Sequence, residues 1–228
     1  MYTKKRQDTS DTVYHKLRER ILHLELPPGA AVSEIETAAM YNVSRTPVRD
    51  AFKTLELEGL LEIRPHIGTF VTQIDMDMVS DILYMREKLE FSVFSELSLR
   101  FEPDWEPVIA EYLQRQQNLI VSDMPADELS RAFITEDNAF HQALYKLAGR
   151  ENVFALFNSF IAQYERFRTF LNMKSKSSLS KLYEEHTEIF RCIKEQDLDN
   201  LKKHVNNHIY KGFNTSPGVI LKHPEYFK

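Results

Sequence analysis

Four side chains in the second half of the chain combine the residue types of a metal site. Asp137 and His141 are four residues apart, so on a helix they lie about one turn apart on the same face. His186 and His208 fall in two further segments with helical patterns. Three imidazoles and one carboxylate suit a divalent transition metal, and a helical bundle can bring such residues to one point. On spacing alone, the alternative is that these histidines cap helices, form hydrogen bonds or face water.

A second group of chemically active residues lies near the start of a predicted helix over 44–59. Opposite the apolar stripe of this helix are the polar side chains of Arg45, Thr46, Arg49 and Lys53. An arginine can bond the edge of a guanine through two hydrogen bonds, and the free N–H groups of a first helical turn suit a phosphate. The pattern predicts a helix that reads the major groove of DNA. The alternative is a solvated, charged face on an ordinary helix.

The elements that position these arginines are three short helices and a hairpin. Apolar spacing, capping residues and breakers predict helices over 10–24, 33–40 and 44–59, and strands over 60–64 and 69–72. Ser33 and Glu36 have the spacing of a capping box, and Gly59 suits the position just past a helix end. This layout is that of a winged helix-turn-helix.

The rest of the chain predicts helices alone, over 76–100, 104–121, 126–148, 151–172, 176–195 and 198–213. Six helices with short connections predict an antiparallel bundle. We therefore expect a mainly α protein with a winged helix-turn-helix domain in residues 1–73 and an all-α antiparallel six-helix bundle in residues 74–228. Only six glycines in 228 residues argue against a sandwich, a barrel or a dinucleotide-binding fold.

Composition narrows the class of protein further. Apolar residues make up 43% of the chain and charged residues 28%, which predicts a packed core. The single cysteine, Cys192, excludes an intramolecular disulfide and favours a reducing compartment. No apolar run approaches the roughly 20 residues of a membrane span, and the N-terminus has no apolar signal core. We expect a cytoplasmic protein with no membrane partner.

Residues 10–72 resemble the DNA-binding domain of the GntR family of bacterial transcriptional regulators. The resemblance is carried by Ser33-Glu34, Val43–Ala51 with the stretch Ser44-Arg45-Thr46-Pro47-Val48-Arg49, Leu55–Leu60 and Gly68–Val71. It implies that Arg45 and Arg49 read bases, while Thr46 and the wing around His66 and Gly68 touch the DNA backbone and the minor groove. Ser44 and Lys53 complete the predicted DNA-binding set. Two positions depart from the usual family pattern, Ile35 after the glutamate and His66-Ile67 at the wing tip.

The second half resembles the effector domain of the FadR branch of this family, the FCD domain. This resemblance is carried by Asp137-Asn138-Ala139-Phe140-His141, Asn152, Glu185-His186, Asp197 and His208-Ile209. It implies that Asp137, His141, His186 and His208 hold a divalent transition metal, zinc first, with nickel, manganese or iron as alternatives. Six helices in place of seven resemble the VanR-like subgroup. His204 matches no ligand position of the family.

The same resemblance implies a small carboxylate effector. Arg86 and Glu90 stand at the Arg-x-x-x-Glu positions of the first bundle helix, where the arginine pairs with the acid of the effector. The alternative is an i,i+4 ion pair on a helix surface, which contributes only about 0.3–0.5 kcal/mol. Tyr164, Arg168 and Asn172 share a helix face and are further candidates for the pocket wall, with exposure as their alternative.

Together these patterns predict a metabolite-responsive transcriptional regulator, a repressor as is most common in the family, and not an enzyme. It would bind a palindromic operator in double-stranded DNA as a homodimer, because one short helix reads too few bases. Two alternatives stay open. One is a metal-dependent hydrolase whose Asp-His₃ site activates water, with Glu185 or Glu90 as base. The other is a purely structural metal with no effector.

Overall fold

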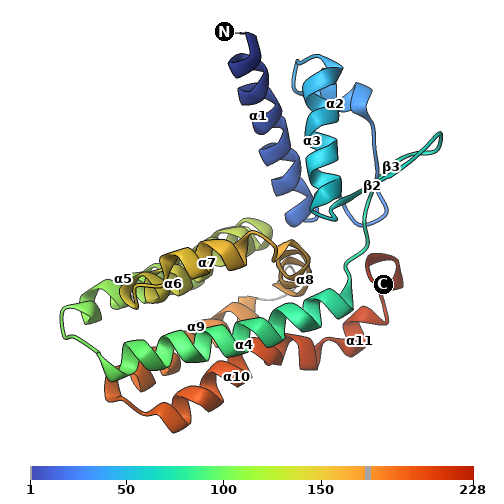
Figure 1. Cartoon of the computed structure of the whole chain (residues 1–228). Coiled ribbons are helices and arrows are strands. Elements are labelled where there is room, and N and C mark those ends of the chain that lie inside the picture. Colours follow the sequence, from blue (N-terminus) through green and yellow to red (C-terminus); the bar gives the residue numbers. More distant parts are fainter. Residues whose placement is uncertain (1, 173–175) are drawn as a thin grey trace.

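The structure is a computed structural model that describes residues 2–172 and 176–228, with side chains described for residues 9–171 and 178–228. A small winged unit (α1 to β3) lies above a larger helical bundle (α4 to α10), as Figure 1 shows. The predicted mainly α fold class is confirmed. In the part of the chain that the structure describes, no helix is both long and apolar enough to cross a membrane.

The winged unit is built from three helices and a three-stranded antiparallel sheet. The helices are α1 (Tyr2–Leu22), α2 (Glu34–Met40) and α3 (Arg45–Leu57). The strands β1 (Ala31–Val32), β2 (Leu61–Arg64) and β3 (Gly68–Val71) pair in the order β1-β3-β2. The sequence did not predict β1, because two residues are too few to show a strand period, and α1 extends further towards the N-terminus than the predicted start at residue 10.

Local chemistry sets the ends of the two helices that follow the first turn. Ser33 caps α2, since its hydroxyl accepts a hydrogen bond of 3.3 Å from the amide of Glu36. Ser44 precedes α3, and Gly59 follows this helix with a φ of +69°, which favours glycine. The apolar face of α3 is fully buried against α1, through Val48, Ala51, Phe52 and Leu55. The opposite face of α3 is therefore turned to solvent.

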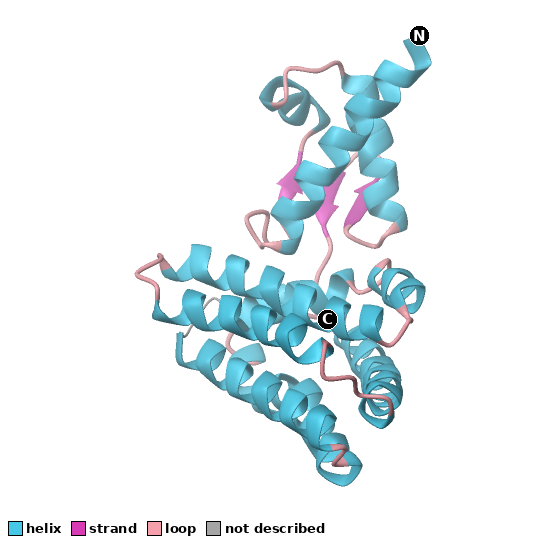
Figure 2. Cartoon of the chain, turned by 90° about the vertical axis from the view of Figure 1, so that its left-hand side faces the viewer, coloured by secondary structure: helices cyan, strands magenta, loops and turns pink. Residues whose placement is uncertain are grey.

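The bundle contains seven helices among the described residues. They are α4 (Met76–Leu99), α5 (Trp105–Val121), α6 (Ala126–Leu147), α7 (Glu151–Asn158), α8 (Ala162–Asn172), α9 (Lys176–Glu195) and α10 (Leu198–Thr215). Their buried core is formed by side chains such as Phe94, Ile109, Phe140, Ile189 and Val205. Figure 2 shows these helices stacked beneath the winged unit, with a single chain segment leading from the sheet into the bundle.

The predicted helix over 151–172 is two helices in the structure. Ser159 and Phe160 form a tight turn, with amide hydrogen bonds to the carbonyls of Leu156 and Phe157, and α8 then leaves in a new direction. The turn contains no proline or glycine, and aromatic residues continue across it, so the break could not be predicted from the residue pattern. The expected six-helix bundle is thus corrected to seven helices, and the helix count on which the VanR-like resemblance rested is lost.

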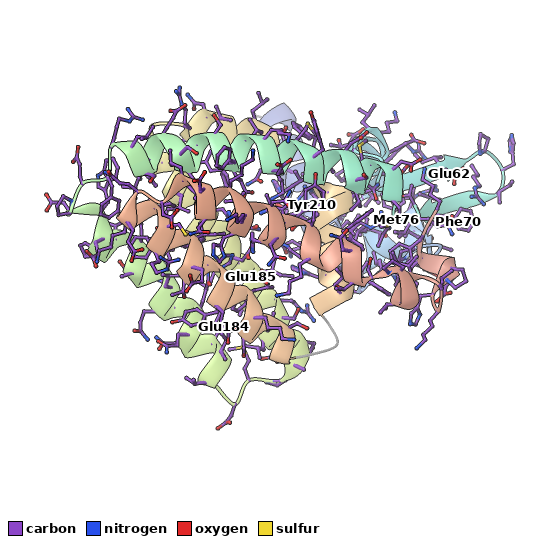
Figure 3. All side chains as sticks on the ribbon, turned by 90° about the horizontal axis from the view of Figure 1, so that it is seen from below. Glu62, Phe70, Met76, Glu184, Glu185 and Tyr210 are labelled. Atoms are coloured by element: carbon purple, nitrogen blue, oxygen red, sulfur yellow. The ribbon has the colours of Figure 1, made fainter. Side chains whose placement is uncertain are left out.

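The tail of the chain returns to the segment between the two units. After α11 (Pro217–Ile220) and the 3₁₀ turn η1 (Pro224–Tyr226), Phe227 forms a parallel bridge with Ile74. The amide of Ile74 donates to the carbonyl of Tyr226 at 2.8 Å, and the amide of Lys228 donates to the carbonyl of Ile74 at 3.0 Å. Seen from below, the hairpin with Glu62 and Phe70 lies beyond the Met76 end of α4 (Figure 3).

Helix α8 joins the winged unit to the bundle. Helix α8 lies directly below α1 and α3 in Figure 1, and its first residue, Ala162, is buried in the core of the winged unit. Gln163 donates to the carbonyl of Gly59 and accepts from the amide of Asp75, both at 3.3 Å. Most of the following residues of α8 are buried as well. The first turns of α8 thus contact the winged unit, and its later residues, such as Phe167 and Phe170, pack in the core of the bundle.

Candidate metal centre and nucleic-acid interface

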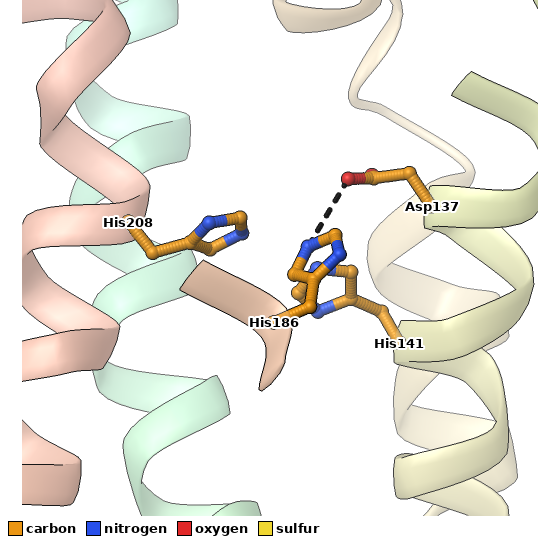
Figure 4. A group of neighbouring side chains, drawn as sticks. All are labelled: Asp137, His141, His186 and His208. Carbon is orange, nitrogen blue, oxygen red and sulfur yellow. Dashed lines mark ion pairs between the residues drawn. The ribbon is translucent and has the colours of Figure 1, made fainter. Parts of the chain in front are cut away.

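The four predicted metal ligands meet inside the bundle. Asp137 and His141 come from α6, His186 from α9 and His208 from α10 (Figure 4). One ligand atom from each residue lies within 4.8 Å of the others, and all four side chains are buried. His204 lies outside this group, one turn before His208. Residues far apart in the sequence are therefore brought together with the donor set of a transition-metal site.

Two neighbouring side chains fix the orientation of the imidazoles. The Nδ1 of His186 lies 2.8 Å from Oε1 of Gln116, and the Nδ1 of His208 lies 3.0 Å from Oε2 of Glu185. Because an amide oxygen and a carboxylate only accept, each imidazole donates through Nδ1, and Nε2 is the ring nitrogen left for a metal. Such partners of the ligands hold the rings in one tautomer and one orientation. Figure 3 shows Glu185 on α9.

The four residues Asp137, His141, His186 and His208, called the cluster below, contain buried nitrogen atoms that lack a hydrogen-bond partner among the described residues. They are Nε2 of His186 and both ring nitrogens of His141. The nearest carboxylate oxygens are those of Asp137, 3.3 Å from Nε2 of His186 (Figure 4), and of Glu90, 3.2 Å from Nδ1 of His141. An unsatisfied buried polar atom costs about 1–3 kcal/mol. Burial also lowers the pKa of His186 to about 4, so this imidazole is neutral at pH 7. A neutral His186 and unsatisfied ring nitrogens beside a carboxylate fit a bound divalent transition metal.

Two arginines lie beside the cluster. Arg168 pairs with the carboxylate of Asp137 and donates to the side-chain oxygen of Asn138 at 2.8 Å. Burial acts to raise the pKa of the Asp137 carboxyl, but the adjacent Arg168 and His186 outweigh it and hold this pKa well below its usual value. Asp137 is therefore ionised at neutral pH and available as an anionic ligand.

Arg86 is the second arginine beside the cluster, in the polar interior of the bundle. Its Nε lies 2.7 Å from Oε1 of Glu90, and its guanidinium also contacts the hydroxyl of Tyr164. The pair is almost fully buried, unlike the surface ion pair that was its alternative. Tyr164 and Arg168, which the helix pattern named as candidates for the pocket wall, both lie here, while the side chain of Asn172 falls outside the described residues.

Two small cavities adjoin these arginines. The first has a volume of about 20 Å³, and its polar wall is formed by Arg86, Glu90, Asn138, His141 and Arg168. The second has a volume of about 60 Å³ and lies between Asp137, His208 and a set of apolar side chains. The first volume holds about one or two water molecules. A small acid can therefore bind beside Arg86 only if neighbouring side chains move.

Gln116 was not recognised from the sequence. It lies on α5 and is completely buried. It continues the buried stripe of this helix, three residues after Leu113, which itself follows Ile109 by four residues. A polar residue on the apolar stripe of a helix is the signal that could have identified it. The motif Glu185-His186 was noted, but the pairing of Glu185 with the other histidine, His208, needed the positions of two helices.

The predicted DNA-binding side chains all lie on the solvent side of the winged unit. Those exposed on or just before α3 are Ser44, Arg45, Thr46, Arg49 and Lys53. His66 and Gly68, both exposed, form the tip of the hairpin with φ angles of 63° and 146°. The winged unit therefore exposes a helix that carries two arginines, the kind of element that a helix-turn-helix protein places in the major groove, and a hairpin tip.

Glu34 connects the two arginines of this face. Its carboxylate accepts from Nη2 of Arg45 at 3.0 Å and from Nε and Nη2 of Arg49 at 3.1 Å each. The sequence placed Glu34 only within a family motif and predicted no role for it. The pairing depends on α2 and α3 meeting in space, which the spacing of the residues does not reveal.

Comparison with protein families decides the identity of this architecture. Residues 9–71 match the model described as bacterial regulatory proteins of the gntR family, and residues 81–211 match the FCD domain. The chain belongs to the GntR family of bacterial regulatory proteins. Its winged unit is the DNA-binding part of a GntR regulator, and its bundle is an FCD effector domain. Both predicted family resemblances are confirmed.

Relatives of this GntR regulator are themselves named as regulators. An HTH-type transcriptional regulator in an unstable DNA locus of Streptomyces ambofaciens is 34% identical over 94% of this chain and 88% of its own length. The HTH-type transcriptional repressor RspR of Escherichia coli K12 is 28% identical over 89% of this chain and 86% of its own length. The hydrolase alternative is set aside, because the family and these relatives are transcriptional regulators.

Solved structures share the fold of this GntR regulator. E. coli McbR/YncC has a TM-score of 0.69 at 18% identity, with 90% of this chain and 95% of that chain covered. A GntR regulator from Rhodococcus sp. RHA1 has a TM-score of 0.66 at 19% identity, with 90% and 98% covered. Similarity at these identities supports the two-part fold alone.

Proposed function

We propose that this GntR regulator is a repressor whose bundle binds a divalent metal and a small carboxylate effector. In this proposal residues 1–73 form the DNA-binding domain, and residues 74–228 bind the effector and form a homodimer. The observation that carries the proposal is the buried group of one aspartate and three histidines beside Arg86 and Arg168.

The proposed metal ligands are Asp137, His141, His186 and His208. Zinc suits this set best, with nickel, manganese or iron as alternatives. A bound divalent ion supplies a positive charge to which a carboxylate oxygen can coordinate. The chain's own part is to orient the imidazoles through Gln116 and Glu185 and to exclude bulk water from the centre.

Charge balance explains why the effector is expected to be an acid. Two buried guanidinium groups, of Arg86 and Arg168, face two buried carboxylates, of Glu90 and Asp137. These four charges cancel, so a divalent ion adds two uncompensated positive charges to a buried site. An anionic ligand then lowers the electrostatic energy of the interior, and an arginine can pair with both oxygens of a carboxylate.

Helix α8 supplies a physical route from the effector to the DNA. Tyr164 and Arg168 reach into the polar interior, whereas Gln163 and Arg166 contact the winged unit and the segment that follows it. An acid that pairs with Arg168 changes its contact with Asp137 and so favours one position of α8 over another. A ligand controls DNA binding only through such a difference in affinity between two arrangements.

The proposed homodimer and palindromic operator follow from the size of the reading element. One helix of thirteen residues contacts too few base pairs for a specific site, and two-fold symmetry doubles the contacts. A role as repressor is supported by the relative RspR, which is named as one.

Elemental analysis of protein purified without added metal or chelator tests the metal site. We expect about one transition-metal ion per protomer in the wild type and in His204→Ala, and none in His186→Ala. His204 is the matched control, because it lies on α10 outside the cluster. Absence of metal from the wild type would remove the site from the proposal.

Thermal shift measurements then separate an effector site from a structural metal. Small mono- and dicarboxylic acids are expected to raise the melting temperature of the metal-loaded wild type and to have no effect on Arg86→Ala. A melting temperature that rises when metal is added, but does not change with any of the acids, would support the purely structural alternative.

A further inference from the structure

Glu34 occupies an unexpected place for an acidic residue. It is the first residue of α2, and its side chain is 25% exposed between the two arginines that are proposed to read bases. DNA carries a dense row of negative phosphates, so a carboxylate on this face opposes binding. A gain in affinity for DNA therefore does not explain why this position carries a carboxylate.

Stability does not account for it either. The side chains of Arg45 and Arg49 are 57% and 55% exposed, and ion pairs at such exposure contribute little to the free energy of unfolding. The helix already has its cap in Ser33, and Glu36 also lies in its first turn, so the terminus of α2 does not depend on Glu34. The geometry of the contact is therefore the informative feature.

The contact fixes both guanidinium groups and leaves donors free. Arg49 uses Nε–H and one hydrogen of Nη2 on Glu34, so its Nη1 group and the other Nη2 hydrogen remain available. Arg45 uses only one Nη2 hydrogen. Each arginine therefore keeps enough N–H groups for a two-bond contact with O6 and N7 of a guanine.

We propose that Glu34 is a specificity-determining positioning residue of the reading helix. It holds Arg45 and Arg49 in the orientation that reads bases, and it lowers the affinity for DNA of arbitrary sequence. An arginine held in place loses less side-chain entropy when it meets the correct base, and it cannot swing freely to the nearest phosphate. This inference rests on the base-reading role proposed above for the two arginines.

The test compares two affinities of the full-length chain. One probe is the duplex that the wild-type protein selects from a randomised DNA library, and the other is a scrambled duplex of the same composition. We expect Glu34→Gln to bind the scrambled duplex more tightly and to lower the ratio of selected to scrambled affinity about tenfold, because loss of orientation weakens the two-bond arginine contacts that discriminate between bases.

Glu36→Gln is the matched control. It removes the same charge from the same helix at an exposed position that does not pair with Arg45 or Arg49. It should raise both affinities by a similar factor and leave their ratio unchanged. Glu34→Asp retains the charge and should restore part of the ratio, because the shorter carboxylate can still hold one arginine.

The outcomes distinguish this inference from the proposed function. If Arg49→Ala lowers the ratio but Glu34→Gln does not, Glu34 is only a surface charge and the inference is wrong. If neither Arg45→Ala nor Arg49→Ala changes the ratio, the reading helix itself is wrongly assigned. Partial unfolding of a variant does not blur the result, because an unfolded fraction lowers both affinities equally.

Discussion

Arg166 donates hydrogen bonds to both the carbonyl oxygen and the hydroxyl of Thr72, the residue that follows the last strand of the wing. Arg166 is 0% exposed, and it pairs with no carboxylate in the described part of the chain. Burial accordingly lowers the pKa of its guanidinium to about 10. The buried guanidinium of Arg166, on α8, is thus held mainly by the backbone carbonyl of Thr72. We call this contact the joint between the bundle and the winged unit.

The first prediction concerns this joint. Arg166→Met removes the donors to Thr72 while keeping a long apolar side chain, so we expect amide hydrogen exchange at residues 72–76 to rise about tenfold or more, since bonds to charged groups contribute about 1.5–3 kcal/mol. Arg131→Met is the control, because it breaks an exposed ion pair to Glu25 across the same two units and should have little effect. Equal exchange in both variants would show that the joint does not depend on Arg166.

The second prediction concerns base reading. Arg49→Ala should leave the melting temperature nearly unchanged, because the side chain is exposed. It should weaken binding to the selected duplex by about 30-fold or more, as one two-bond contact is lost from each protomer of the proposed dimer. Gel-shift titration measures the affinity. Unchanged specific affinity would contradict the assignment of α3 as the reading helix.

The third prediction concerns the orientation of His186, a proposed metal ligand. Gln116→Leu removes the acceptor of the His186 Nδ1–H bond, and loss of such a partner lowers metal affinity by about 10–100-fold. Competition with a chromophoric chelator measures this affinity. Gln117→Leu, at the exposed neighbouring position, should bind metal as the wild type does. A wild-type affinity in Gln116→Leu would mean that packing alone holds the imidazole.

The fourth prediction concerns alkaline pH. Burial and the hydrogen bond to Glu58 raise the pKa of Tyr14 to about 12, against 10 for an unperturbed tyrosine. The folded state therefore holds the phenolic proton more tightly than the unfolded state, and this stabilisation is lost as the pH rises from 10 towards 12. Denaturant titrations should show a shallower loss of unfolding free energy over this interval in Tyr14→Phe. Parallel curves for the two proteins would contradict the prediction.

Features set by neighbouring residues along the chain were predictable from the sequence. The cap at Ser33, the glycine after α3 and the hairpin around His66 all depend on a few adjacent residues, and the structure has them where they were expected. The grouping of Asp137 with three histidines was also predicted. The spacing of these residues alone did not favour a metal site over capping, hydrogen bonding or exposure of the histidines, and the prediction depended on the family resemblance.

Features set by distant partners were not predictable. The helix is interrupted between Asn158 and Ala162, so that α8 can start in the core of the winged unit. No residue type in this turn indicates the interruption. Gln116 and Glu34 are likewise defined by what they meet, an imidazole on α9 and two guanidinium groups on α3. A polar residue reveals such a role only once the helices around it are placed.

The two-sided use of α8 restricts how this regulator can evolve. Gln163 and Arg166 face the winged unit, while Tyr164 and Arg168 face the polar interior, so both sets share one short stretch of helix. Each inserted or deleted residue turns an α-helix by about 100°. A single residue inserted between Gln163 and Arg168 would rotate one part of the helix relative to the other. Either the contacts with the winged unit or those with the polar interior would then be lost. Length changes are therefore expected to accumulate elsewhere, and α8 to vary in this lineage by substitution alone.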